Sequence, residues 1–190
     1  MKAKRKEWQR RMKRFDVKSL VFVDESGVQN NMTRFYGRII GGERLHESAP
    51  GGNWNTTTLM SSLRFDGSIA AMTIEGATDA FSFEAYISKI LCPTLDRGDI
   101  VIMDNLSSHK VNGIREAIEA TGAILLYLPP YSPDFNPIEM MWSKIKTFLR
   151  KTKARSTKML MKAIANAFKT ITFSDTVGWF TSCGYVLIHS

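Results

Sequence analysis

The apolar residues of the chain gather into short runs, and this pattern predicts buried β-strands. Residues 19–25 (SLVFVDE) and 99–104 (DIVIMD) are apolar runs rich in β-branched residues, and both end in carboxylates. Residues 123–128 form a third run of this kind. Short apolar runs of this composition are typical of strands in the interior of a sheet. We therefore expect three strands at these positions.

A hairpin is predicted between the first and second of these strands. Residues 55–65 and 68–75 are strand-like runs joined at Asp66-Gly67, and an Asp-Gly step between two such runs favours a tight turn. Glycine and proline make residues 26–53 rich in loops, with a candidate strand at residues 34–40. We expect the two runs to pair as antiparallel strands.

Helices are predicted in the segments between and after the strands. Gly122 ends one of them. Asn136-Pro137 begins another, because asparagine caps a helix and proline suits its first position. Four prolines in residues 129–137 predict a rigid loop before that start. The predicted helices span residues 79–91, 110–121, 137–151 and 156–170.

The order of the predicted elements indicates the fold class. An antiparallel hairpin followed by alternating helices and strands gives a mixed α/β sheet flanked by helices. The ribonuclease H-like fold has this order, and other α/β folds share it. A length of 190 residues suits one domain with a sizeable core.

The charge is segregated along the chain. Residues 1–18, a basic helix or arm whose few apolar points include Trp8 and Met12, carry a net charge of +7. Residues 19–143 carry −7 and residues 144–190 carry +8, which leaves +8 in total. Two basic ends around an acidic middle suit a polyanion that the ends bind and the middle cleaves. Solvated helix faces are the structural alternative.

Several classes of protein are excluded by composition. No apolar run approaches the roughly 18 residues needed to cross a bilayer, and the basic N-terminus lacks the apolar segment of a secretory signal. Cys92 and Cys183 lack the spacing of a disulfide framework or a metal site. We therefore expect a soluble cytoplasmic protein with free thiols, associated with the nucleoid.

Three carboxylates stand at the ends of predicted elements, namely Asp24, Asp104 and Glu139. Asp24 and Asp104 each follow an apolar strand, and ligands of α/β sheets gather beyond such strand ends. Adjacent carboxylates repel each other unless a cation neutralises them. Oxygen ligands without His or Cys suit Mg²⁺ or Mn²⁺, and two ions about 4 Å apart promote phosphodiester cleavage. The pattern favours a two-metal site.

Each of these carboxylates also has a structural alternative. An Asp after a strand is often a turn residue, and Asn136 with Glu139 has the spacing of a capping box. Neighbouring acids are less suitable. Glu25 points to the opposite face of its strand, Asp99 lies at the wrong end of its strand, and Asp134 lies in the proline loop.

The helix predicted at residues 137–151 adds candidate DNA contacts. Glu139, Ser143, Lys146 and Arg150 follow each other at steps of four, three and four along one flank of its apolar stripe. A DNA backbone along this line would meet the two cations while its scissile phosphate met Glu139. The candidate DNA-binding residues are Lys144, Lys146, Arg150, Lys151, Lys153, Arg10 and Arg11.

Weaker candidates lie beside the carboxylates. Asn105 has the position to orient a metal-bound water, and His109 to touch a phosphate; both also suit turns and helix starts. Tyr131 and Phe135 in the proline loop suit either contact with a base or packing onto the core, of which packing is the favoured interpretation.

These segments resemble a known family. VFVDESG (21–27), DIVIMDNLSSHK (99–110) and YLPPYSPDFNPIEMMWSKIK (127–146) are similar to the three acidic motifs of DDE transposases, in particular the bacterial insertion-sequence branch of the mariner superfamily. Asp104 and Glu139 are separated by 34 residues, as in that family. Supporting likeness lies in GGNWNTTTL (51–59), EGATDAFSFEAYI (75–87) and CGY (183–185).

The resemblance implies a fold, a reaction and partners. Asp24, Asp104 and Glu139 would be the catalytic triad that binds Mg²⁺ or Mn²⁺, as two ions, on a ribonuclease H-like domain at residues 19–190. That domain would follow a basic arm at residues 1–18. The reaction would be hydrolytic nicking at the ends of a mobile element, followed by attack of the freed 3′-hydroxyl on target DNA. The partners would be both DNAs and further copies of the chain.

One departure from the family concerns the N-terminus. Relatives carry a pair of helix-turn-helix modules, whereas here only a basic segment of about 20 residues precedes the first predicted strand. We expect either a catalytic half that works with a separate helix-turn-helix polypeptide from an upstream frame, or a truncated relic. Two other functions remain open: a structure-selective nuclease of the same fold, and an inactive DNA-binding remnant.

Overall fold

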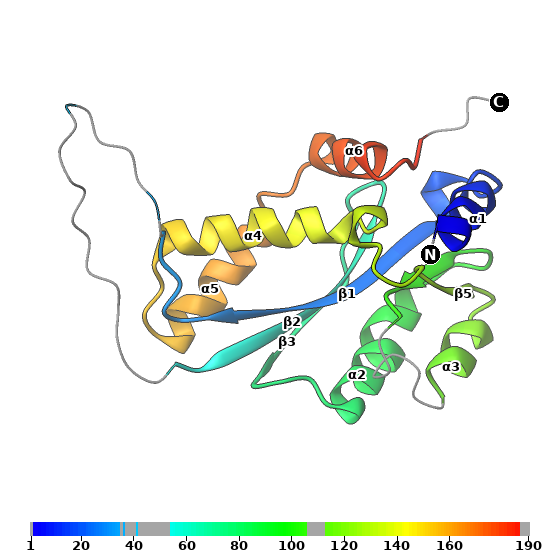
Figure 1. Ribbon diagram of the computed structural model, residues 1–190. Coiled ribbons are helices and arrows are strands. Elements are labelled where there is room, and N and C mark those ends of the chain that lie inside the picture. Colours follow the sequence, from blue (N-terminus) through cyan, green and yellow to red (C-terminus); the bar gives the residue numbers. More distant parts are fainter. Residues whose placement is uncertain (1, 35, 37–40, 42–53, 106–112, 187–190) are drawn as a thin grey trace.

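A five-stranded mixed sheet forms the centre of the computed structural model, which describes residues 2–34, 36, 41, 54–105 and 113–186 (Figure 1). The strands follow the spatial order β3-β2-β1-β4-β5. Strands β3, β2 and β1 pair antiparallel, and β1, β4 and β5 pair parallel. The mixed sheet predicted from the sequence is confirmed. Its strands are β1 (Leu20–Gln29), β2 (Thr56–Arg64), β3 (Ala71–Glu75), β4 (Ile100–Met103) and β5 (Ile124–Tyr127).

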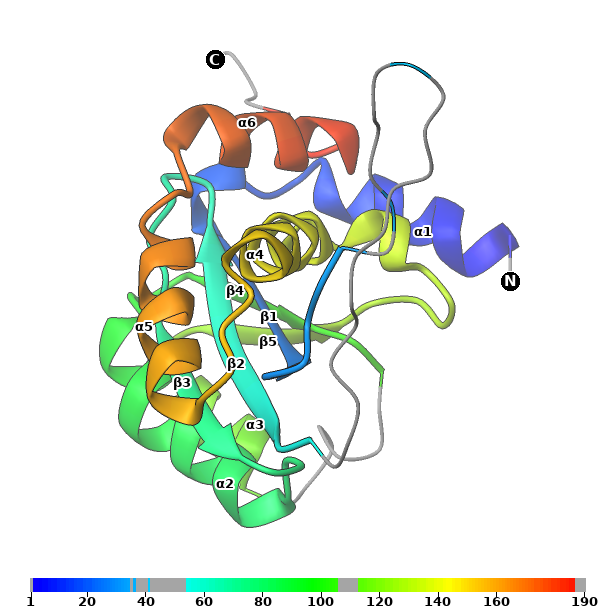
Figure 2. The same cartoon turned by 90° about the vertical axis from the view of Figure 1, so that its left-hand side faces the viewer.

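Helices cover both faces of this sheet. Helices α2 and α3 lie on one face, while α4, α5 and α6 lie on the other (Figure 2). The chain beyond α2 continues as a π-helical turn at residues 87–91 and a 3-10 turn at residues 92–94. The helices are α1 (Lys2–Met12), α2 (Ala80–Tyr86), α3 (Ile114–Ala120), α4 (Ile138–Thr152), α5 (Thr157–Phe168) and α6 (Phe173–Ser182).

Alternation along β1 divides its side chains between two cores. Leu20 and Phe22 join the core beneath α4, whereas Val21 and Val23 join the core beneath α2 and α3. Successive strand residues point to opposite faces, so the same alternation places Asp24 on the side of α4. Burial on both faces explains why this strand reads as a continuous apolar run.

Two strand boundaries differ from the sequence prediction. Strand β1 extends to Gln29 instead of ending at Glu25, because residues up to Gln29 pair with β2. Strand β3 begins at Ala71 instead of residue 68, and the turn before it contains Gly67, whose φ of +89° suits glycine. The candidate strand at residues 34–40 and the start of the helix expected at residue 110 lie outside the described residues.

Helix α1 is joined to the rest of the fold through its apolar side. Trp8 and Met12 are buried in the core beneath α4. The Trp8 indole donates a hydrogen bond to the Tyr185 hydroxyl (3.0 Å), which donates to the backbone carbonyl of Phe135 (2.7 Å). Burial raises the pKa of Tyr185, so its hydroxyl keeps the proton that it donates. The basic segment thus contributes to packing near the proline loop.

Helix α6 was missed by the sequence prediction. Its segment holds glycine, aromatic and β-branched residues, all weak helix formers. Tertiary contacts override that weakness, because Phe180 is fully buried and packs edge-on against Phe22. A capping box between Thr172 and Asp175 begins the helix, and that T-x-x-D spacing is the sequence signal that identifies it.

No helix in the described ranges is long and apolar enough to cross a membrane.

We predict that the contact between α4 and α6 weakens in acid. Hydrogen bonds from Lys144 and Thr172 lower the pKa of Asp175 from 3.8 to about 2. A carboxyl whose pKa is lowered by folding stabilises the fold above its unfolded pKa, and that stabilisation is lost as the pH falls toward the folded value. Asp175→Asn should therefore lower the melting temperature at pH 7.

The pH profile supplies the check on this prediction. The difference in melting temperature between wild type and Asp175→Asn should shrink between about pH 4 and pH 2, as Asp175 becomes protonated in the wild type. Exposed Asp66, whose carboxylate accepts a hydrogen bond within its own turn, provides the control variant Asp66→Asn. A difference for Asp175→Asn that stays constant across this range would contradict the assignment.

Candidate active site

Two of the predicted site carboxylates lie on adjacent parallel strands: Asp24 lies within β1, not at its end as expected, and Asp104 directly follows β4. Val23 of β1 pairs with Met103 of β4, and Asp24 and Asp104 are the next residues of the two strands. Neighbouring strands lie about 4.8 Å apart, so the register brings these two residues to the same level of the sheet. By the alternation of side chains along each strand, both lie on the face of the sheet that α4 covers. Asp24 is buried and Asp104 half-buried.

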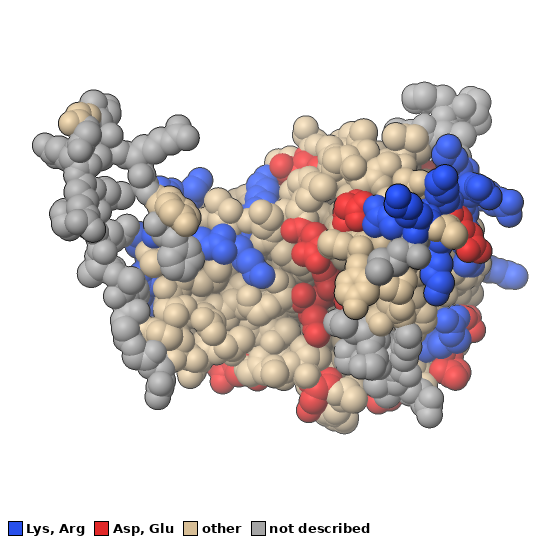
Figure 3. All heavy atoms as spheres, in the orientation of Figure 1, with Lys and Arg blue, Asp and Glu red and all other residues tan. Residues whose placement is uncertain are grey.

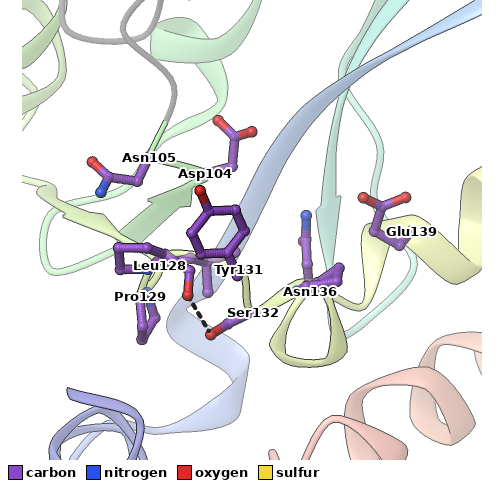
Figure 4. Close-up of a pocket in the computed structure, with 10 residues that line it drawn as sticks. Asp104, Asn105, Leu128, Pro129, Tyr131, Ser132, Asn136 and Glu139 are labelled. Atoms are coloured by element: carbon purple, nitrogen blue, oxygen red, sulfur yellow. Dashed lines mark hydrogen bonds between the residues drawn. The ribbon is translucent and has the colours of Figure 1, made fainter. Parts of the chain in front are cut away.

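Glu139 faces them from the first turn of α4. A pocket of about 360 Å³ separates the strand ends from this helix, and its walls include Asp104, Asn105, Asn136 and Glu139. In Figure 4 the side chains of Asp104, Asn136 and Glu139 point toward the same side of the pocket. Glu139 is exposed. Asp24 does not line this pocket, but its carboxylate contacts Asn136, which does.

The capping box between Asn136 and Glu139, the structural alternative to a catalytic role, does not form. Helix α4 has Pro137 at its N-cap, without a side-chain cap. The Asn136 amide nitrogen instead donates to Asp24 Oδ2 at 3.4 Å. Asn136 is buried, and its Oδ1 has no hydrogen-bond partner among the described residues. The sequence predicts Asn136 only as a helix cap, and no local pattern indicates its contact with Asp24.

The donor set of this site consists of oxygen atoms. Carboxylates of Asp24, Asp104 and Glu139 and the unpartnered amide oxygen of Asn136 are the ligand types that Mg²⁺ and Mn²⁺ prefer. Their chemistry therefore fits a hard divalent cation. Within the ranges that the structure describes, no three His, Cys, Asp or Glu side chains are grouped closely enough to hold a metal ion together. Glu139 stands across the pocket from the Asp pair.

Two competing acids have structural roles. Asp99, at the other end of β4, is buried and binds the Arg64 guanidinium with both oxygens. Asp134 binds Arg5 of α1, and this hydrogen bond lowers the pKa of Asp134. Both lie in ion pairs, which the sequence did not predict. Glu25 points away from Asp24, into the opposite side of the sheet.

The proline loop before α4 is held in place by Arg5 of α1. Arg5 donates to Ser132 and Asp134, and its guanidinium lies 4.3 Å from the centre of the Phe135 ring. Phe135 is 5% exposed, which confirms the prediction that it packs onto the core. The same prediction is wrong for Tyr131, which is 85% exposed on the pocket wall. No pattern in the sequence pointed to Arg5 as the partner of this loop.

The candidate DNA-binding cations differ in their surroundings. Lys144 pairs with Asp175 of α6. Lys146, Arg150 and Lys153 are half-buried, while Lys151, Arg10 and Arg11 are exposed. Figure 3 shows acidic side chains in a band between basic groups over the C-terminal half of α4 and others over α1. Asn105 lines the pocket, and His109 lies outside the described residues.

Comparisons with known proteins agree with this geometry. The family described as DDE superfamily endonuclease matches residues 19–161. The Tc1 transposase of Caenorhabditis elegans is 28% identical over 123 residues, which cover 63% of this chain and 42% of that protein. The chain thus spans less than half the length of this relative.

Solved structures share the fold. A pre-cleavage Mos1 transpososome superposes with a TM-score of 0.75 at 16% identity, over 96% of this chain and 57% of that one. The catalytic core of BIV integrase superposes with a TM-score of 0.50 at 15% identity, over 80% of this chain and 82% of that one. The ribonuclease H-like fold predicted from the sequence is confirmed.

We predict that Glu139→Gln leaves stability unchanged. Glu139 is exposed and forms no cap, so the free energy of unfolding should change by less than about 0.5 kcal/mol. Ser156→Ala is the matched positive control, because Ser156 caps α5 and its loss should cost about 1 kcal/mol. Urea unfolding of both variants measures the difference. A loss for Glu139→Gln as large as that for Ser156→Ala would restore a structural role to Glu139.

Proposed function

Because the chain belongs to the DDE superfamily of endonucleases, we propose that it is the catalytic domain of a DNA transposase. It would cleave phosphodiester bonds at the ends of a mobile element and join the freed ends to target DNA. The observation that carries this proposal is the register of β1 with β4, which brings Asp24 level with Asp104 across from Glu139.

Asp24, Asp104 and Glu139 are the proposed catalytic triad. Two of them extend from the sheet and the third from α4, so a scissile phosphate in the pocket would be approached from two sides. Asn136 would hold Asp24 in place through its amide nitrogen. Asn105, on the pocket wall beside Asp104, would help to orient the reacting groups.

We infer that the triad holds Mg²⁺ or Mn²⁺, as two ions. Bound there, the ions would supply positive charge that activates the attacking oxygen and stabilises the leaving oxygen. The Mos1 structures include a paired-end complex with Mn and a catalytic domain with Mg. The chain's own contribution would be carboxylate oxygens, held by the sheet on one side and by the start of α4 on the other.

DNA would run from the pocket along the exposed flank of α4. Lys146 and Arg150 follow Glu139 on this flank at helical spacing, and Lys151 and Lys153 extend the basic area. Lys144 would add to it only by releasing Asp175. Arg10 and Arg11, exposed on α1, would contact DNA on the other side of the acidic band.

Further partners follow from the same proposal. The Mos1 structures are transpososome and paired-end complexes, and we propose that this chain also associates with itself on DNA. We place it in the bacterial insertion-sequence branch of the mariner superfamily, acting on the nucleoid in the cytoplasm. Specific recognition of the element ends would come from helix-turn-helix modules, in this polypeptide or in a second one, and the sequence of the DNA that flanks the coding segment tests this point.

We predict that Asp104→Asn abolishes nicking of supercoiled plasmid DNA in Mg²⁺ or Mn²⁺. Loss of the negative ligand weakens the electrostatic stabilisation of the transition state, which should cost on the order of 100-fold or more in rate. Asp96→Asn, at the opposite end of β4 and exposed, is the matched control and should nick normally. Melting temperatures confirm that both variants fold.

Two outcomes would refute this function. Wild-type nicking that persists in excess chelator would exclude the metal-dependent reaction. Nicking by folded Asp104→Asn at the wild-type rate would remove Asp104 from the triad. Joining of a labelled 3′-hydroxyl end to plasmid DNA separates a transposase from a nuclease that only cuts.

We predict that Arg10 and Arg11 contribute to the salt dependence of DNA binding. Each lost phosphate contact lowers the slope of log K against log salt concentration by about 0.9, so Arg10→Gln with Arg11→Gln should lower it by about 1.8. Arg115→Gln is the control, because Arg115 pairs with Glu119 on α3. Fluorescence anisotropy over a range of salt concentrations gives the slopes. Equal slopes for wild type and the double variant would mean that α1 does not touch DNA.

A further inference from the structure

Tyr131 is an exposed aromatic residue on the wall of the acidic pocket. It is 85% exposed and lines the pocket together with Asp104 and Glu139. In Figure 4 its ring stands free of the backbone and its hydroxyl points to the same side as the Asp104 carboxylate. Folding usually buries large aromatic groups of this kind, and Phe135 of the same loop is buried. Phe81 is exposed as well, so it is the combination of exposure with a place on the pocket wall that distinguishes Tyr131.

The backbone of Tyr131 has an unfavourable conformation. Its φ is +55°, which side chains with a β-carbon rarely adopt and which glycine adopts freely. Such a conformation persists only where the surrounding structure imposes it, and it gathers at binding sites. Tyr131 thus occupies a position that suits glycine, and its side chain does not stabilise the turn.

The surrounding loop holds Tyr131 rigidly. Prolines flank the Tyr131–Ser132 step on both sides, and buried Ser132 donates to the Pro130 carbonyl (3.3 Å) while accepting from Arg5 (2.9 Å). Behind the loop, Tyr185 donates to the carbonyl of Phe135. An aromatic ring on a fixed loop loses little conformational entropy when a flat partner stacks on it.

We propose that Tyr131 is a stacking platform for an unpaired nucleobase of the DNA bound in the pocket. This inference rests on the function proposed above, which it deepens. Every unpaired base offers an aromatic face, whatever the DNA sequence, and base–aromatic stacking is a principal source of affinity for single-stranded DNA. The pocket walls suit a base more than an apolar protein segment, because carboxylates of Asp104 and Glu139 lie on them.

The position of Tyr131 specifies which base it contacts. The ring shares one pocket of about 360 Å³ with two members of the proposed triad, so the base belongs to a nucleotide next to the scissile phosphate. A base there is available for stacking only when it has left the duplex. Tyr131 therefore favours frayed or opened DNA ends over intact duplex.

Hairpin DNA with one unpaired 3′ nucleotide tests the proposal. The unpaired nucleotide carries either a normal base or an abasic sugar, which keeps the phosphate charge and removes only the stacking surface. Binding is measured in Ca²⁺, a divalent ion that oxygen ligands also bind. Wild type should bind the normal DNA on the order of 10-fold more tightly than the abasic DNA. Tyr131→Ala should bind both DNAs equally, whereas Tyr131→Phe should retain the preference.

A fluorescent base and two further variants complete the test. The fluorescence of 2-aminopurine at the unpaired position should be quenched by wild type but not by Tyr131→Ala. Phe81→Ala is the control and should also quench it, because the exposed Phe81 ring on α2 does not line the pocket. Tyr131→Gly should lose the quenching while melting at or above the wild-type temperature, because glycine relieves the positive φ. A structural role would lower that temperature.

The possible failures are distinguishable. If wild type binds normal and abasic DNA equally, or Tyr131→Ala keeps the preference for the normal base, the stacking proposal is overturned while plasmid nicking still supports the transposase. If wild type shows no nicking under any metal condition, the proposed function fails, whatever the fluorescence shows.

Discussion

The parallel pairing of β1 with β4 is the constraint on which the site depends. The pairing of β1 with β4 ends where Val23 lies opposite Met103, and the next residue after each of them is an aspartate. A shift of one residue in either strand would turn one of these carboxylates to the opposite face of the sheet. The apolar side chains of both strands prevent that shift, because they fill two separate cores. Packing of the sheet and chemistry of the site are thus set by the same register.

The sequence carried enough information for the sheet and for the relation between Asp24 and Asp104. Apolar runs that end in aspartate predict buried strands, and parallel strands with such ends meet at one edge. The partners of the proline loop were not predictable, because Arg5 and Tyr185 lie 127 and 50 residues from the loop residues that they bind. No local pattern encodes a contact of that separation.

Asn136 shows how one residue permits two local interpretations. Its spacing from Glu139 fits a capping box, and helix α4 does begin beside it. The choice is made by tertiary structure, because the buried Asp24 carboxylate lies within reach of the amide. A buried carboxylate gains more from a hydrogen-bond donor than an exposed one does, because water no longer serves it. Burial of Asp24 therefore determines the role of Asn136, and α4 begins without a side-chain cap.

The hydrogen-bond chain from Trp8 through Tyr185 to Phe135 has a consequence for the order of synthesis. A ribosome adds residues from the N-terminus, so Asp24, Asp104 and Glu139 all exist before Tyr185 does. The loop that leads into Glu139 acquires its contact with Tyr185 only after the chain has been made as far as residue 185. The nascent protein therefore holds all three carboxylates before this part of the support for their pocket is complete.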